Sequence, residues 1–465
     1  MIAALLGMFA AASAMPQTCM AVLCQPEALA PFAAQLADPP PERPLHILQL
    51  GDSHTAGDAI TRAWRDDWQA RLGNGGRGML PPGRPYPGYR ARGLSVTVSS
   101  GWTMKGVFGA VSAPPRPPIG LSGYTLVSNT AGATLGLVAD AGQEFDALLL
   151  CAVAGPAGGK ITVTLGPVAQ TIDLAADADT PRCRRFTAPD RQTQAQILVL
   201  NGQARITSWG VERRGAGIML SNLGVPGAQL IHLARSDDAV IAEELRAWAP
   251  DLIVIAFGTN EGFAPRVDGS AVAAVLRQQV ERLRRLAGPV PMLIIGAPDA
   301  LTRNTVLQNN ADGPAPDCNS FIDNAPAFQV ALPTLIALDI ADAAPLPPPL
   351  VPGFALVDLP PPPTMTAIEP QPRPQVGTGR PLFAPPGLAV VRAAQRRVAA
   401  EMGLAFWDWQ ARMGGSCAAV GYVQATPRLM AGDFIHYTSA GGTEIARRLR
   451  IDLAHAGAVT GAALR

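Results

Sequence analysis

The chain has 465 residues, about three times a domain of ~150 residues, which predicts two or three domains or one domain with large insertions. Its 37 basic and 36 acidic residues nearly balance, and a net charge of +1 argues against a nucleic-acid-binding protein or a polybasic membrane-surface protein. Hydrophobic residues make up 48% of the chain, so a sizeable buried core is expected.

The N-terminus has the pattern of an export signal. Residues 1–14 are apolar and end in Ala12-Ser13-Ala14, a small-x-small motif typical of a cleaved signal peptide, with a buried N-terminal helix as the alternative. We expect residues 15–44 to be a linker. No other run reaches the ~18 apolar residues of a membrane-spanning helix, so no integral membrane segment is expected.

Six cysteines fit an oxidising compartment, with a reduced cytosolic protein as the alternative. Their positions suggest the pairs Cys19–Cys24, Cys151–Cys183 and Cys318–Cys417. No spacing of cysteines and histidines is typical of zinc. Together with the signal peptide, the cysteines predict a periplasmic or secreted protein.

The first predicted elements are a buried strand, Leu45–Leu50, and a helix from Asp58 to Leu72. Apolar side chains recur every four residues along that helix, and Gly73 follows it. From residue 77 to residue 216 the helical period disappears, and short alternating runs such as Lys160–Leu165 are separated by Gly and Pro. This stretch predicts an antiparallel β-sandwich or jelly roll.

The α/β rhythm returns at residue 217. The predicted strands are Ile218–Asn222, Leu252–Phe257, Met292–Ile295 and Leu404–Trp407, and the predicted helices are Asp238–Trp248, Ala271–Leu286, Leu388–Met402 and Ser439–Ala454. Such alternation predicts a parallel sheet covered on both faces. The α/β domain would therefore comprise residues 45–76 and 217–457, with the sandwich inserted between them.

A second interruption, residues 341–386, holds 15 prolines. We expect a long extended surface loop there, with a Pro-rich partner-binding segment as the alternative.

The first predicted strand ends in Gly51-Asp52-Ser53-His54. Ligands of open α/β sheets bind at the carboxyl ends of the strands, so Ser53 is well placed as a nucleophile. A serine nucleophile needs a base and an orienting acid, and Asp433-Phe434-Ile435-His436 offers both. Taken alone, the Gly-Asp-Ser triplet usually marks a turn or a helix cap. Without Ser53, the Asp-His pair would be read as a helix-capping Asp and a surface His.

Acyl transfer also needs hydrogen-bond donors for the oxyanion. Two candidates follow the next predicted strands: the backbone N–H of Gly227 and the side-chain amide of Asn260. The backbone N–H of Ser53, at the start of a helix, is the third. In isolation, Gly227 would be read as a turn residue and Asn260 as a loop cap.

These four ordered blocks resemble the SGNH/GDSL hydrolase superfamily. The resemblance implies a flavodoxin-like three-layer α/β/α fold and a serine esterase with the triad Ser53, His436 and Asp433 and the oxyanion donors Ser53, Gly227 and Asn260. It implies no metal or organic cofactor. Two residues depart from the usual pattern: His54 replaces Leu, and Glu261 replaces Asp.

The departures point to narrower relatives, because Gly51–Asp58 and the segment Phe406-Trp407-Asp408-Trp409 are similar to those of bacterial peptidoglycan O-acetylesterases. Those enzymes carry a β-sandwich resembling a carbohydrate-binding module at the place of the β-rich stretch here. The resemblance implies a serine esterase that removes O-acetyl groups from a glycan of the bacterial envelope, with peptidoglycan as the expected substrate. Alternatives are an O-acetyltransferase, an esterase of acetylated exopolysaccharide or xylan, and a glycan-binding protein with a vestigial hydrolase domain. Trp407 and Trp409 could stack on sugars, but core packing is the stronger expectation. The oligomeric state is left open.

Overall fold

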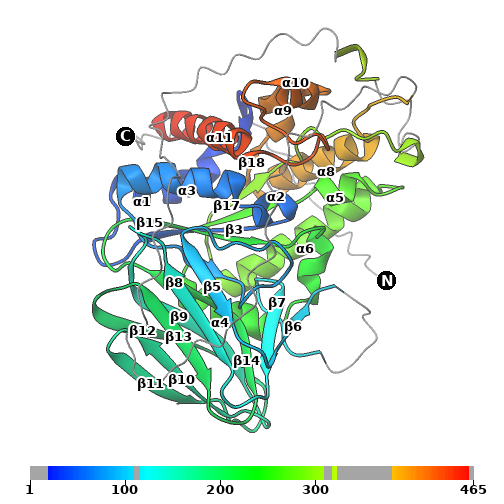
Figure 1. Ribbon diagram of the computed structural model, residues 1–465. Helices are drawn as coiled ribbons and strands as arrows, with labels where there is room; N and C mark the ends of the chain where they lie inside the picture. The colour runs from blue at the N-terminus through cyan, green and yellow to red at the C-terminus, as the bar shows by residue number, and fades with distance from the viewer. Residues whose placement is uncertain (1–18, 109–115, 308–316, 322–379, 460–465) are drawn as a thin grey trace, which may run out of the picture.

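The computed structural model describes residues 19–108, 116–307, 317–321 and 380–459 (Figure 1). The predicted signal peptide, residues 1–14, and most of the predicted Pro-rich loop lie outside the described residues. Among the residues that are described, none of the helices combines the length and apolar character that crossing a membrane demands.

A seven-stranded sheet forms the centre of the α/β part. Its strands, in spatial order, are β1 (Cys19–Met20), β2 (Leu23–Cys24), β18 (Ala405–Trp407), β17 (Met292–Ile295), β16 (Leu252–Ala256), β3 (Leu45–Gly51) and β15 (Ile218–Gly224). The five strands from β18 to β15 are mutually parallel, and β2 runs antiparallel to β18. Parallel strands must be buried on both sides, which explains why β3, β15 and β16 are buried throughout.

Helices cover both faces of this sheet. One face carries α1 (Ala30–Ala37), α3 (Ala59–Leu72), α9 (Trp409–Met413), α10 (Ala418–Gln424) and α11 (Ser439–Val459), and the other carries α4 (Asp238–Trp248), α6 (Gly269–Ala287) and α8 (Pro386–Met402). Successive strand residues point to opposite faces, so Ile47 packs in the first layer and Leu48 in the second. The shorter helical elements are α2 (Ser53–Ala56), α5 (Thr259–Gly262), η1 (Pro26–Leu29), η2 (Leu230–Arg235) and η3 (Thr305–Leu307). The result is the predicted three-layer α/β/α arrangement.

Every regular element that the structure describes between α3 and β15 is a β-strand. One sheet has five strands, in the spatial order β11 (Val168–Asp173), β10 (Lys160–Leu165), β13 (Gln194–Val199), β8 (Thr134–Ala139) and β5 (Leu94–Val98). The second sheet has the spatial order β12 (Thr180–Gln192), β9 (Phe145–Ala154), β14 (Ala204–Glu212), β7 (Tyr124–Ser128) and β6 (Trp102–Gly106). A further strand of this second sheet, β4 (Gly78–Leu80), pairs with β14. Strands of both sheets contribute side chains to one apolar core, so the two sheets form a sandwich.

The prediction of a linker over residues 15–44 is wrong for Cys19–Ala37. Residues Cys19–Ala37 form β1, β2, η1 and α1, and β2 extends the edge of the central sheet through β18. Leu23, Leu29 and Phe32 are buried in the core of the α1 layer. Two-residue strands and a helix of eight residues are too short to produce a recognisable period, which is why the sequence did not reveal them.

The six cysteines form the three expected disulfides, Cys19–Cys24, Cys151–Cys183 and Cys318–Cys417. The first closes the β1–β2 hairpin, and the second links β9 to β12.

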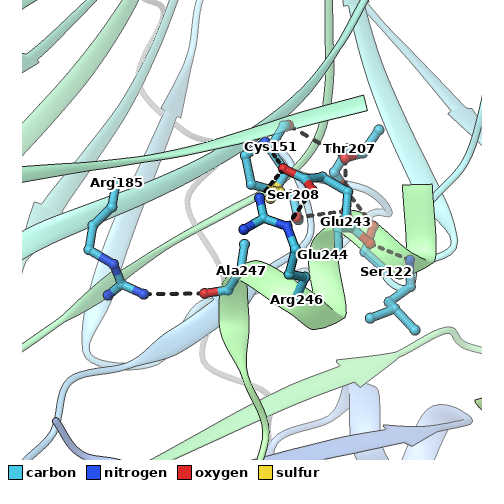
Figure 2. Close-up of a disulfide and its surroundings, with 11 residues drawn as sticks. Ser122, Cys151, Arg185, Thr207, Ser208, Glu243, Glu244, Arg246 and Ala247 are labelled. Carbon is cyan, nitrogen blue, oxygen red and sulfur yellow. Dashed lines mark hydrogen bonds and ion pairs between the residues drawn. A yellow bond between two sulfur atoms is a disulfide. The ribbon is translucent and has the colours of Figure 1, made fainter. Parts of the chain in front are cut away.

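Helix α4 fixes the sandwich to the α/β part (Figure 2). The Glu244 side chain is fully buried, and its Oε1 accepts hydrogen bonds from the Thr207 and Ser208 hydroxyls of β14 at 2.8 and 2.7 Å. Its Oε2 accepts the Leu121 N–H at 2.7 Å. On the same helix, Glu243 accepts the N–H of Cys183 at 2.8 Å. Buried polar contacts of this kind specify one orientation of the two parts, because an unpaired carboxyl would be costly.

Candidate active site

Ser53 lies where β3 turns into α2, at the carboxyl edge of the central sheet. The turn is tight: a Cβ at Gly51 would overlap the Thr55 side chain and lie 2.7 Å from the Ala256 carbonyl oxygen, so only glycine fits. Asp52 caps α2, with its Oδ1 accepting the His54 N–H at 3.0 Å. Ser53 itself is half-buried and lies between two buried neighbours, Asp52 and His54.

His436 and Asp433 lie on the turn before α11. Asp433 Oδ1 accepts the backbone N–H groups of Ile435 and His436, both at 3.0 Å, while Phe434 between them takes a left-handed conformation with φ 60°. Both carboxylate oxygens of Asp433 therefore accept hydrogen bonds within one turn, because Oδ2 accepts the His436 Nδ1–H. The three-residue spacing seen in the sequence is what brings the acid and the imidazole to the same side of the turn.

The structure brings Ser53, His436 and Asp433 together. His436 Nδ1 is 2.7 Å from Asp433 Oδ2, and His436 Nε2 is 3.0 Å from Ser53 Oγ. Because the carboxylate accepts from Nδ1–H, Nε2 is left as the acceptor for the serine hydroxyl proton. Burial raises the pKa of Asp433, but the hydrogen bonds from the His436 ring and from the His436 and Ile435 N–H groups outweigh it and lower the pKa to about 2. Asp433 is thus ionised across the physiological range.

The two predicted oxyanion donors lie on neighbouring loops of the same sheet edge. The loop with Gly227 follows β15, and Asn260 belongs to α5 directly after β16; these strands flank β3. Asn260 Nδ2 donates to the Ala228 carbonyl at 2.9 Å, and Gln229 Nε2 donates to the Asn260 carbonyl at 3.2 Å. Gly227 is exposed and has φ 76°, with open space where a side chain would start. Both residues therefore lie on loops that follow the two neighbours of β3, the strand that leads to Ser53.

The carboxyl of Glu261 accepts a third hydrogen bond between these loops. Glu261 Oε1 accepts the Leu230 N–H at 2.7 Å, and burial raises the pKa of Glu261 to about 7. The residue lines a largely apolar cavity of about 200 Å³ between the loops and helices α6 and α8. In the sequence, Glu261 is recognisable only as a departure from the usual Asp, and its hydrogen bond to Leu230 is seen only in the structure.

Three of the four remaining histidines of the sequence lie in surroundings that differ from those of His436. His46 is buried at the start of β3, with Nδ1 2.8 Å from the Trp248 carbonyl and Nε2 2.7 Å from Ser221 Oγ; burial lowers its pKa to about 4. His232 caps its own turn by accepting the Gln229 N–H. His54, by contrast, lies in contact with the Ser53–His436 pair, a role that the sequence did not reveal.

Trp407 and Trp409 are buried, with 1% and 5% of their surface exposed, so the core interpretation holds. Trp409 stacks on Tyr437, the residue after His436, with 5.3 Å between the ring centroids. Within the described part of the chain, no group of His, Cys, Asp and Glu side chains is arranged to hold a metal ion.

No protein-family model matches the sequence, and no curated protein is significantly similar to it. Among solved structures, one described as a peptidoglycan O-acetylesterase superposes with a TM-score of 0.64 at 21% identity, over 94% of this chain and 97% of that chain. A family two carbohydrate esterase from Cellvibrio japonicus aligns at 14% identity over 44% of this chain and 79% of that chain. A salicylyl-acyltransferase from a tetracycline biosynthetic pathway aligns at 13% identity over 80% and 99%. Their TM-scores of 0.17 and 0.28 are too low to bear on the fold. The resemblance to the peptidoglycan O-acetylesterases that the motifs predict is thus confirmed at the level of the fold.

Proposed function

We propose that this protein is a serine O-acetylesterase that removes acetyl groups from an envelope glycan, with O-acetylated peptidoglycan as its substrate. The observation that carries the proposal is the hydrogen-bonded series from Asp433 through His436 to Ser53, with distances of 2.7 and 3.0 Å. An acid, an imidazole and a serine hydroxyl in this order are the elements of a nucleophilic acyl-transfer mechanism.

In the first half-reaction, Ser53 Oγ attacks the acetyl carbonyl carbon while His436 Nε2 takes the hydroxyl proton. The tetrahedral intermediate collapses when His436 gives that proton to the departing sugar oxygen, leaving acetyl-Ser53 and a free sugar hydroxyl. In the second half, His436 takes a proton from a water molecule, whose oxygen attacks the acetyl carbonyl carbon. His436 then gives that proton to Ser53 Oγ as the acyl–oxygen bond breaks and acetate leaves. Asp433, ionised because its pKa is near 2, stabilises the imidazolium in both halves.

The negative charge on the former carbonyl oxygen needs donors already in place. The Ser53 N–H at the start of α2, the Gly227 N–H and the second N–H of the Asn260 amide take that role in the proposal. The first N–H of the same amide donates to Ala228, which restricts the amide's rotation. A donor fixed before the reaction costs no reorganisation during it.

Two observations support the choice of substrate and place. The fold is shared, over nearly its whole length, with a structure described as a peptidoglycan O-acetylesterase. Three disulfides are typical of proteins that fold in an oxidising compartment, which favours a periplasmic or secreted location.

The inserted sandwich is proposed to resemble a carbohydrate-binding module that presents the polymer to Ser53, with residues 77–216 as its extent. A near-neutral chain suits a neutral ester, for which long-range electrostatic steering contributes little.

The test is acetate release from O-acetylated murein and from acetylxylan by the wild type, Ser53→Ala and the control Ser270→Ala. Ser270 is an exposed serine at the start of α6, and its backbone N–H donates to Asp268. We expect release from murein to fall by about 10³-fold or more in Ser53→Ala and to stay unchanged in Ser270→Ala. Wild-type-level release by Ser53→Ala would refute the mechanism. Preference for acetylxylan would refute the substrate, and acetyl transfer to an added oligosaccharide in place of acetate release would identify a transferase.

A further inference from the structure

His54, the residue after the proposed nucleophile, is one of the most enclosed polar side chains at this sheet edge. Its side chain is 5% exposed, whereas the His436 side chain is 47% exposed. The ring meets Trp409 and Tyr437 edge-on, with centroids 5.3 and 5.8 Å away, and lies 5.6 Å from the ring of His436. His54 therefore fills the space behind the Ser53–His436 pair without opening to the surface where a substrate would bind.

The hydrogen bonds of His54 fix its ring on both sides. Nε2 lies 2.9 Å from the Ile435 carbonyl oxygen, and because a carbonyl only accepts, Nε2 carries a hydrogen and donates it. Nδ1 lies 3.3 Å from Asp52 Oδ1 and 3.4 Å from Thr259 Oγ1. Burial lowers the pKa of His54, but the hydrogen bond and charge of Asp52 and the Ile435 carbonyl raise it above the ordinary value. This direction is consistent with donation from both nitrogens.

These contacts join two turns that are far apart in the sequence. Ile435 is the residue before His436, so the position of its carbonyl sets the peptide plane from which His436 projects. His54 itself stands on the turn that carries Ser53, 381 residues away from its carbonyl partner. From this geometry we infer that His54 is a positioning residue: its Nε2–H holds the Asp433–His436 turn at the distance at which His436 accepts the Ser53 proton.

The size of the expected effect follows from how steeply acyl transfer depends on placement. The Ser53–His436 contact is 3.0 Å, already at the favourable separation for proton transfer. A displacement of about 1 Å in such a contact can cost about 10² in rate. His54 does not touch the substrate, so its loss should lower kcat and leave KM nearly unchanged.

Three substitutions separate the two ring nitrogens. His54→Gln places an amide N–H at the position of Nε2 and keeps the bond to the Ile435 carbonyl. His54→Asn places one at the position of Nδ1 and keeps only the bond to Asp52, while His54→Leu keeps neither. We expect kcat for p-nitrophenyl acetate to fall about 10- to 100-fold in the Leu and Asn variants, with KM within about twofold, and to be largely restored in the Gln variant.

The inference rests on the proposed function, and a second measurement keeps the two apart. The rate at which a fluorophosphonate labels Ser53 reports the activation of the hydroxyl whatever the natural substrate is. A wild type that neither labels nor hydrolyses would refute the serine mechanism itself. With an active wild type, undiminished labelling and kcat in His54→Leu, or equal rates in the Asn and Gln variants, would overturn the role of His54. The Asn–Gln comparison decides the matter even if the Leu variant fails to fold.

Discussion

The orientation of His436 depends on which atom of residue 433 faces its ring, and Asp433→Asn tests this directly. In the wild type, Oδ1 accepts two backbone N–H groups and Oδ2 accepts the imidazole Nδ1–H at 2.7 Å. An asparagine would keep its carbonyl oxygen toward the two N–H groups, because an NH₂ group there would face two donors. Its NH₂ group would then face Nδ1.

That exchange reverses the hydrogen on the ring. Nδ1 becomes the acceptor, the hydrogen moves to Nε2, and Nε2 can no longer accept the Ser53 hydroxyl proton across the 3.0 Å contact. The imidazolium also loses its counter-charge. For a triad with its aspartate replaced by asparagine, such a tautomer change lowers kcat by about 10⁴, and we expect a loss of about 10³ to 10⁴ here.

The assay is hydrolysis of p-nitrophenyl acetate by the wild type, Asp433→Asn and Asp268→Asn. Asp268 is the matched control, because its carboxylate also accepts two backbone N–H groups, at the start of α6, but it contacts no histidine. Asn is an equally good N-cap, so this variant should keep full activity. The thermal midpoints of both variants should stay close to that of the wild type. If Asp433→Asn retained about a tenth or more of the wild-type kcat, the tautomer argument would be refuted.

Two further outcomes are expected. Asn260→Ala removes one proposed oxyanion donor and the hydrogen bond to the Ala228 carbonyl, and it should lower kcat about 10²- to 10³-fold. The control Asn201→Ala, in the sandwich, should leave kcat unchanged. Equal kcat values for the two variants would exclude Asn260 from the oxyanion site. Glu244→Gln puts an NH₂ group against either the Leu121 N–H or the Thr207 and Ser208 hydroxyls. It should lower the free energy of unfolding by about 1–3 kcal/mol in urea titrations, while Glu281→Gln on the exposed side of α6 leaves it unchanged. An unchanged unfolding midpoint for Glu244→Gln would show that this contact does not hold the sandwich.

Much of the α/β part was predictable because long elements carry a period. Helix α4, Asp238–Trp248, and strand β17, Met292–Ile295, have the predicted bounds, and α8 begins two residues before the predicted Leu388. Their sequences show amphipathic helices with flanking caps and fully apolar strands. The Cys19–Ala37 segment has neither, and its burial comes from packing on β18 and α11, which no local pattern records.

The residues of the candidate site also fall into two groups, those that a sequence motif predicts and those that it does not. Ser53, His436 and Asp433 could be found because their motifs are short and ordered along the chain. His54 and Glu261 could be seen only as unusual residues, since their partners lie on other turns: the Ile435 carbonyl for His54, and the Leu230 N–H for Glu261. A hydrogen bond to backbone leaves no trace in the identity of the partner residue. Side chains that position a site through backbone atoms are therefore the ones that a sequence motif conceals.

Asp58, the last residue of the Gly51–Asp58 motif, has a structural reason to be there. It is buried, takes φ 52° at the start of α3, and accepts the Thr61 hydroxyl at 2.6 Å. Burial raises its pKa, but the charges of Arg65 and Arg77 lower it, so the carboxyl stays ionised. Arg77 is the first residue of the predicted insertion and also donates to Asn222 at the end of β15. One motif thus carries the nucleophile at one end and, at the other, an ion pair that anchors the entry to the sandwich. Because a buried charge that loses its partner is strongly destabilising, the placement of the sandwich and the integrity of the Ser53 turn depend on the same few side chains.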